Sequence, residues 1–282
     1  MEDEMFAAAL LAVTTLLAGN HRIDLTFGGL QRSYIVYVPA GVSKSAPVVI
    51  NLHGGGSNAE QQQKFSGMDA VADREHFIVV YPNGTGSERM RVWNAGTCCG
   101  AAPLERIDDV GFIRALIDDL SRRIPIDRKR VYATGMSNGA MMSYRIAAEA
   151  PDLVAAIAPV SGSMVLMNFH STHPVPVMHF HSVDDPRALY FGGLGPAFPG
   201  TSIRNLHPPV EEQLAKWIGV DGCRTTPSIA KSVKGQPGTA DEGNTATKLV
   251  YAPCSTGANV VLWKLSGSGH VWPGRDIRAP RL

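Results

Sequence analysis

Short, continuously apolar runs alternate with helical patterns along most of the chain, and this alternation limits the possible fold more than any other feature. Seven apolar runs have strand character: 33–38, 48–52, 77–81, 130–134, 154–160, 175–181 and 260–265. Helical spacing of apolar residues occurs over 110–124, 138–150 and 208–218. Most of the strand-like runs are apolar at every position, as strands covered on both faces are. The pattern predicts a mostly parallel sheet with helices on both faces, a three-layer α/β sandwich, with Asp109 as the N-cap of the first helix.

Composition excludes some classes of partner. The 282 residues are 44% hydrophobic and 18% charged, which suits a chain with a large buried core. The formal net charge is +1 and no long basic run is present. We therefore expect no nucleic-acid partner, and a small or neutral ligand is favoured.

The N-terminus is ambiguous. Residues 6–17 form an apolar run of signal-peptide length that is too short to span a bilayer. The preceding MEDEM is acidic, whereas an export signal has Lys or Arg there. Export would place the protein in the extracellular or periplasmic space, and a buried N-terminal helix would leave it cytoplasmic. We assign residues 1–21 to this signal-like segment and residues 22–282 to one domain, with no stable membrane span.

A serine lies in a tight turn between a predicted strand and a predicted helix. Residues 135–139 read GMSNG, and a G-x-S-x-G sequence in this context is a nucleophile elbow. Glycines are needed because the turn strains the serine backbone and brings neighbouring main chain too close for a side chain. The following helix directs its positive end at the serine, where negative charge would develop. We therefore predict that Ser137 is a catalytic nucleophile.

A serine nucleophile needs a base, and the base needs an acid that orients it. After an elbow, these follow later strands in the order Ser, Asp/Glu, His. The strand over 175–181 is followed by Asp184 and Asp185, and the strand over 260–265 is followed by a Gly/Ser loop that contains His270. Both partner types therefore occur where the elbow requires them.

Two alternatives to this assignment stay open at the sequence level. Asp184 and Asp185 leave the strand end in different directions, so only one of them can reach His270. His207 is a less suitable base, because it leads into a helix instead of following the last strand.

A glycine-rich loop follows the second apolar run. Residues 53–56 read HGGG, a type of loop that donates a backbone N–H to an oxyanion hole. We expect the N–H groups of Gly55, with Gly54 as a further candidate, and of Asn138 to bind the oxyanion. His53 is expected to brace this loop and to take no part in the chemistry.

These stretches together resemble a known family. The chain resembles the bacterial esterases grouped with poly(3-hydroxybutyrate) depolymerases and feruloyl or acetylxylan esterases. The matching stretches are PVVINLHGGG, WNAGTCCG, DDVGFIRALIDDL, RVYATGMSNGAMMSYRIA, FHSVDDP and GSGHVWPG. The resemblance covers most of residues 33–274 and implies an α/β-hydrolase fold, with Ser137 as nucleophile, Asp185 as acid and His270 as base. It also implies a carboxylesterase that needs no cofactor and acts on a small ester, a polyester or a plant cell-wall ester. Ser182 replaces a glycine that is usual in the acid segment of this family.

Three side chains near these segments are candidate substrate-binding residues. Trp93 and Trp272 flank segments of the predicted site, and Met136 precedes the nucleophile. A core or rim position remains open for both tryptophans. The loop over 187–207 carries several large apolar residues, and we expect it to form one wall of an apolar or aromatic acyl pocket.

The four cysteines suggest one disulfide. Cys223 and Cys254 bracket a polar stretch, and a bridge between them is expected if the protein is exported. Cys98 and Cys99 are adjacent, and whether they pair with each other or remain free stays open. Zinc binding is disfavoured because no C-x-x-C pair is present.

Two rival functions are also considered. His170, His173, His179 and His181 lie within twelve residues and close to two aspartates, as in a metallohydrolase. No H-E-x-x-H signature accompanies them, and a metal site would leave the elbow unexplained. The second rival is a catalytically silent binding protein with the same fold.

Overall fold

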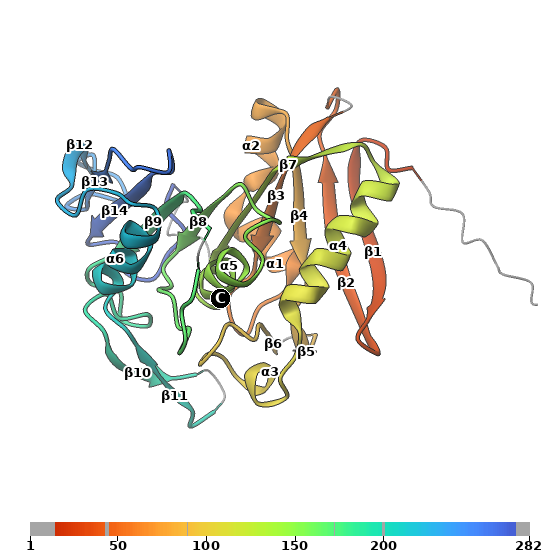
Figure 1. The fold of residues 1–282 in the computed structure, drawn as a ribbon, viewed down its shortest axis with the longest axis horizontal. Helices are drawn as coiled ribbons and strands as arrows, with labels where there is room; N and C mark the ends of the chain where they lie inside the picture. Colours follow the sequence, from red (N-terminus) through yellow and green to blue (C-terminus); the bar gives the residue numbers. More distant parts are fainter. Residues whose placement is uncertain (1–14, 43–44, 89, 172, 199–200, 275–282) are drawn as a thin grey trace, which may run out of the picture.

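A twisted ten-stranded sheet runs through the molecule (Figure 1). The computed structural model describes residues 15–42, 45–88, 90–171, 173–198 and 201–274. In spatial order the strands are β1 (Gly19–Phe27), β2 (Leu30–Val38), β4 (Ile78–Pro82), β3 (Ala46–Leu52), β7 (Ile126–Met136), β8 (Ala156–Val160), β9 (Val177–Ser182), β14 (Val260–Ser266), β13 (Thr245–Tyr251) and β12 (Ser228–Lys234). The six strands from β4 to β14 are parallel to one another, and the two at each edge are antiparallel.

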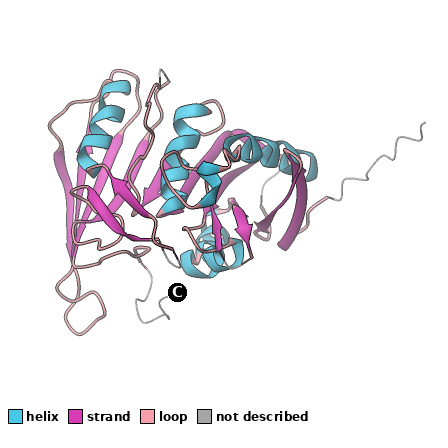
Figure 2. Cartoon of the chain, turned by 90° about the horizontal axis from the view of Figure 1, so that it is seen from below, coloured by secondary structure: helices cyan, strands magenta, loops and turns pink. Residues whose placement is uncertain are grey.

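Helices cover both faces of this sheet. They are α1 (Ala59–Ser66), α2 (Met68–Glu75), α3 (Ala101–Leu104), α4 (Asp109–Arg123), α5 (Asn138–Glu149) and α6 (Val210–Val220). Side chains of β4 alternate between the faces: Ile78 and Val80 join the core under α4, α5 and α6, whereas Val79 and Tyr81 pack with α1 and α2. Figure 2 shows the same arrangement from below. The predicted three-layer α/β sandwich is therefore confirmed.

Two short antiparallel pairs lie outside the main sheet. One joins β5 (Thr85–Ser87) to β6 (Met90–Val92), and the other joins β10 (Gly193–Ala197) to β11 (Arg204–His207). The second pair forms a hairpin within the predicted pocket loop, and in Figure 1 it projects away from the sheet.

All seven predicted strands are present. The unpredicted strands of the main sheet, β1, β12 and β13, lie at its two sides, and the four strands of the short pairs were not predicted either. β12 is exposed along its whole length and β1 is largely exposed, so neither carries a continuous apolar run. β1 begins at Gly19, inside the 1–21 segment, and Leu16 is already buried. Residues 1–14, most of the apolar run over 6–17, lie outside the described residues. None of the described helices is long and apolar enough to cross a membrane.

The expectation that Asp109 caps α4 is wrong by one residue. The Asp108 carboxylate accepts the Gly111 N–H at 2.8 Å and is the N-cap. Asp109 is fully buried, where it accepts from Arg32 at 2.7 Å and from the Asn94 N–H at 2.8 Å. Neighbouring aspartates look alike in sequence, but only one can face the sheet.

This difference predicts unequal effects of removing the two carboxylates. Asp108→Ala should lower the free energy of unfolding by about 1 kcal/mol, the usual effect of losing a cap. Asp109→Ala leaves the buried Arg32 charge without its partner, so a loss of about 3–5 kcal/mol is expected. Urea unfolding of both variants measures this, and equal losses would contradict the assignment.

Candidate active site

Ser137 occupies a strained turn at the carboxyl end of the central strand β7. Its φ of 56° and ψ of −116° lie outside the regions that most residues adopt, as expected for an elbow. Its N–H donates to the Val160 carbonyl of β8 at 2.9 Å. A Cβ atom added to Gly135 or Gly139 would lie 2.6 or 2.3 Å from the Leu52 carbonyl oxygen. Both glycines are therefore needed for the close approach of β3 to the elbow.

The glycine loop after β3 lies against the elbow. A Cβ atom on Gly54 would contact the Ser137 Cβ at 3.7 Å, and one on Gly55 would contact the Asn138 Cβ at 3.5 Å. The Asn138 N–H is in the first turn of α5 and has no partner within that helix. The Gly55 N–H donates to no backbone carbonyl among the described residues. Gly55 and Asn138, whose N–H groups are the expected oxyanion donors, are therefore neighbours in space.

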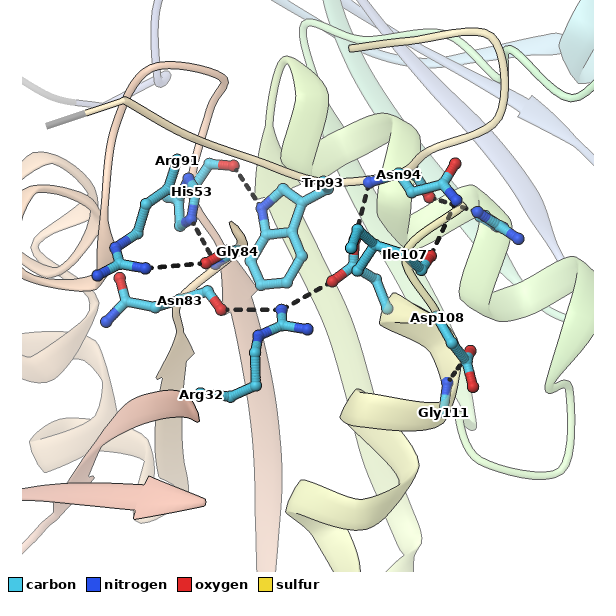
Figure 3. Close-up of polar contacts among 12 residues, drawn as sticks. Arg32, His53, Asn83, Gly84, Arg91, Trp93, Asn94, Ile107, Asp108 and Gly111 are labelled. Atoms are coloured by element: carbon cyan, nitrogen blue, oxygen red, sulfur yellow. Dashed lines mark hydrogen bonds and ion pairs between the residues drawn. The ribbon is translucent and has the colours of Figure 1, made fainter. Parts of the chain in front are cut away.

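His53 fixes the orientation of this loop, as Figure 3 shows for its contact with Gly84. The His53 Nε2 accepts the Gly84 N–H at 3.0 Å, so the ring proton is on Nδ1, which donates to the Gly54 carbonyl at 2.8 Å. In a trans peptide the carbonyl and the next N–H point in opposite directions. The Gly55 N–H is therefore turned away from the imidazole. Burial lowers the pKa of His53 to about 4, which keeps the ring neutral at pH 7.

Trp93 braces the glycine loop over residues 53–56, the candidate oxyanion loop, from inside the protein. Its indole N–H donates to the His53 carbonyl at 3.0 Å, while its backbone exchanges two hydrogen bonds with the Asn138 side chain, at 2.7 and 3.1 Å. The Trp93 side chain is 0% exposed. A substrate cannot contact a fully buried side chain, so the expectation that Trp93 binds substrate is corrected. Sequence placed Trp93 correctly beside the site, but its burial depends on the tertiary fold.

The remaining substrate-binding candidates differ in exposure. Met136 is 5% exposed and packs beside Gly54, so little of it can contact a ligand. Trp272 is half-buried in the segment after His270 and remains a candidate.

The β10–β11 hairpin brings an aromatic ring to the oxyanion loop. A Cβ atom on Gly55 would lie 2.6 Å from the Phe198 ring, so the two residues are in contact. Of the other large residues in the predicted pocket loop, Tyr190 is buried and Phe191 and Leu194 are exposed. A cavity of about 530 Å³ lies between this hairpin and the segment after β8; its lining includes Met164, Val165, Phe191, Leu206 and His207.

The structure brings His270 to Asp185. The His270 Nδ1 lies 2.7 Å from Asp185 Oδ2, and the other carboxylate oxygen accepts the N–H groups of Arg187 and Ala188 at 2.8 and 2.9 Å. Burial alone would raise the pKa of Asp185, but hydrogen bonds from His181 and His270 outweigh it and lower that pKa. Asp185 is therefore ionised at neutral pH and can orient the His270 ring.

Asp184 has a different contact set. Its carboxylate accepts the Gly267 N–H at 2.8 Å and the Ser182 hydroxyl at 2.5 Å. It thus ties the end of β9 to the loop that carries His270. Ser182, the residue that stands where the family usually has glycine, takes part in this tie.

The His270 loop is also attached beside the elbow. The Ser161 hydroxyl donates to the Val271 carbonyl at 3.4 Å, and Ser161 follows the residue that accepts the Ser137 N–H. Ser137, Asp185 and His270 therefore all lie at the carboxyl edge of neighbouring parallel strands. Among the described residues no hydrogen bond joins the Ser137 hydroxyl to His270. Such catalytic hydrogen bonds often tighten only when substrate is bound.

The histidine cluster of the sequence is divided in the structure. His179 and His181 are fully buried in β9, whereas His170 and His173 are exposed. No group of three or more metal-ligating side chains is found within the described ranges. His207, the alternative base, lines the cavity, but Asp185 is hydrogen-bonded to His270.

Both cysteine pairs are joined in the structure. Cys223, just after α6, is bonded to Cys254, which follows β13, and Cys98 is bonded to its neighbour Cys99. The Cys99 N–H donates to the carbonyl of Trp93, so the adjacent pair lies beside the brace of the oxyanion loop.

Sequence comparison identifies the family at this point. The chain belongs to the esterase PHB depolymerase family, whose profile matches residues 32–210. It is 29% identical over 251 residues to a bifunctional acetylxylan esterase/xylanase of Neocallimastix patriciarum, with 89% of this chain and 32% of that protein covered. It is 28% identical over 246 residues to feruloyl esterase B of Piromyces equi, with 85% and 42% covered. The chain spans less than half the length of these two relatives.

A solved structure shares the fold. Acetyl xylan esterase from Aspergillus awamori superposes with a TM-score of 0.61 at 18% sequence identity, with 90% of this chain and 95% of that chain covered. The α/β-hydrolase fold predicted from the family resemblance is therefore confirmed.

The buried neutral state of His53 predicts a pH dependence of stability. Its folded pKa of about 4 lies below the ordinary value of 6.5, so the unfolded chain takes up the proton first. The stabilisation is complete above pH 6.5 and is lost as the pH falls towards 4. In His53→Asn an amide N–H lies near the position of Nδ1, and the amide cannot be protonated. Between pH 6 and 4.5, wild type should lose about 1.4 kcal/mol per pH unit more than this variant in urea unfolding. Parallel pH profiles for the two proteins would contradict the assignment.

Proposed function

We propose that the protein is a serine carboxylesterase in which Ser137, His270 and Asp185 form a catalytic triad. The observation that carries this proposal is the 2.7 Å contact between His270 and the buried, ionised Asp185, at the same sheet edge as the strained Ser137. Membership of an esterase family supports ester hydrolysis as the reaction.

In the proposed reaction the Ser137 hydroxyl attacks the ester carbonyl while His270 takes its proton. Asp185 keeps the imidazole in the required tautomer and stabilises its cationic form. The N–H groups of Gly55 and Asn138 bind the oxyanion, and each such donor contributes on the order of 3 kcal/mol in related hydrolases. His270 then protonates the leaving alcohol, and water releases the acid from the acyl-enzyme. No cofactor takes part.

The proposed substrates are feruloyl or short acyl esters and hydroxyalkanoate polyesters. The names of the relatives point to esters of plant cell walls, and the family name points to a polyester. Phe198 beside Gly55 supplies an apolar surface next to the proposed oxyanion hole, and Trp272 is a second candidate contact. Hydrolysis of methyl ferulate, acetylated xylan and a 3-hydroxybutyrate oligomer, measured side by side, ranks these classes.

We propose an extracellular or periplasmic location. Disulfides persist in oxidising compartments, and the Cys223–Cys254 bridge therefore supports this location.

Removal of the nucleophile should abolish turnover. Ser137→Ala is expected to lower kcat for p-nitrophenyl butyrate by about 10⁶-fold, since the triad acts as a unit. Ser121→Ala, on the outer part of α4, is the matched control and should retain full activity. Activity of Ser137→Ala within tenfold of wild type would refute the assignment.

The two neighbouring aspartates should respond differently. Asp185→Asn is expected to lower kcat by about 10⁴-fold, because the amide stabilises the wrong imidazole tautomer and cannot balance its charge. Asp184→Asn retains an acceptor oxygen for the Gly267 N–H and should lose far less activity. Steady-state kinetics decide between them, and the reverse order would make Asp184 the acid.

A further inference from the structure

A chain of buried hydrogen bonds leads from the nucleophile helix to the proposed catalytic acid. The Tyr144 hydroxyl, on α5, lies 2.9 Å from His179 Nδ1. The His179 Nε2 lies 3.0 Å from His181 Nδ1, and the His181 Nε2 lies 2.7 Å from the Ala188 carbonyl. Tyr144 is 1% exposed and both histidines are 0% exposed. The two histidines are two residues apart on β9, which places them on one face of the strand.

The direction in which these hydrogen bonds donate follows first from the Tyr144 end. The Tyr144 hydroxyl has His179 as its hydrogen-bond partner and no other among the described residues. A buried hydroxyl that does not donate is costly, so Tyr144 donates and His179 Nδ1 accepts. Burial lowers the pKa of His179 well below its usual range, so the ring is neutral. Its single proton is then on Nε2 and is donated to His181 Nδ1.

The opposite end of the hydrogen-bond chain is consistent with this direction. A backbone carbonyl can only accept, so the His181 Nε2 carries a proton and donates it to Ala188. Since His181 Nδ1 already accepts from His179, His181 is neutral as well. The reverse direction would leave the buried Tyr144 hydroxyl without an acceptor. Only one arrangement of protons satisfies every polar group in the chain.

The last N–H of the chain also faces the carboxylate. The His181 Nε2 lies 3.3 Å from Asp185 Oδ2, the same oxygen that contacts His270. Its N–H therefore donates to the Ala188 carbonyl and makes a longer contact with Asp185. With the two backbone N–H groups on the other oxygen, each oxygen of Asp185 lies close to two N–H groups.

We propose that His181 is a positioning residue for Asp185, and that His179 and Tyr144 fix the tautomer in which it donates. This inference rests on the proposed function of Asp185 and extends it to three residues that do not touch the substrate. A neutral donor restrains the carboxylate without cancelling its charge. The full negative charge of Asp185 thus remains available to the imidazolium that forms on His270.

Other titratable groups face this chain from each neighbouring element. They are His207 from β11, Tyr190 with its ring centroid 5.6 Å from that of His181, Glu211 of α6 bonded to Tyr190, Lys264 of β14 bonded to Glu211, and His270 from the loop after β14. The pKa of His207 is lowered by its burial. On the sides away from Asp185 and His270, the groups near His181 are therefore the neutral His207 and Tyr190 rings and the Glu211–Lys264 ion pair, whose charges offset each other.

Two substitutions of His181 separate positioning from packing. His181→Phe keeps an aromatic ring in the space but removes the donor to Asp185. In His181→Gln the amide nitrogen takes nearly the place of Nε2, and the amide oxygen can accept from His179. We expect His181→Phe to lower kcat for p-nitrophenyl butyrate by about 10- to 100-fold, the effect of one hydrogen bond to a charged group, with KM within about twofold. His181→Gln should recover most of this loss.

The pH profile supplies a readout that packing alone would not change. A carboxylate with one donor fewer attracts the imidazolium proton more strongly. The acidic limb of the kcat/KM profile should therefore move to higher pH in His181→Phe and stay in place in His181→Gln. Wild-type kcat and an unshifted acidic limb in a folded His181→Phe protein would overturn the inference.

Nitrogen-15 NMR of the wild-type imidazole rings tests the chain without any variant or substrate. His179 and His181 should both show the Nε2–H tautomer at pH 7, and His53 should show the Nδ1–H tautomer and serve as an internal contrast. An Nδ1–H or doubly protonated His181 would overturn the inference, whether or not the protein is an esterase. Absence of ester hydrolysis by the wild type would instead refute the proposed function, and the tautomers would still decide the direction of the chain.

Discussion

The contact between Asp185 and His270 is the interaction on which the proposed site depends. A buried carboxylate is stable only when hydrogen bonds replace its water, and Asp185 receives them from the two backbone N–H groups that follow it and from two imidazoles. This arrangement draws the loops after β9 and β14 together. Asp184 adds a second tie between the same loops through Gly267. The site is therefore held by the ends of parallel strands, which cannot move separately.

Two buried histidines maintain the two halves of the site, and they use opposite tautomers. His53 donates from Nδ1 to the carbonyl of Gly54, which turns the next N–H outward, and His181 donates from Nε2 beside Asp185. In each case a neighbouring group that can only accept or only donate determines the position of the proton. Burial keeps His53 neutral, so its Nε2 remains an acceptor for the Gly84 N–H and the loop keeps its orientation. Neither histidine needs to touch a substrate to affect catalysis.

Much of the fold and the core of the site could be predicted from sequence, because they depend on local patterns. The continuous apolar runs gave the seven inner strands, and the G-x-S-x-G turn placed Ser137 at the strained angles that were found. β1, β12 and β13 were missed because none of them has a continuous apolar run. The predicted N-cap of α4 was wrong by one residue, because Asp109 turns inward to the buried Arg32 and Asp108 caps the helix instead. The burial of Trp93 and the pairing of His179 with Tyr144 likewise arise from contacts distant in sequence.

The proposed function requires that acyl transfer passes through the strained Ser137. Rapid acid quenching of the protein during turnover of p-nitrophenyl acetate, followed by peptide mass mapping, tests this most directly. An acetyl adduct of about 42 Da is expected on the peptide that contains Ser137, because an activated serine forms a covalent acyl-enzyme. Turnover with no adduct on that peptide, or with an adduct that forms on another residue at the rate of turnover, would contradict it.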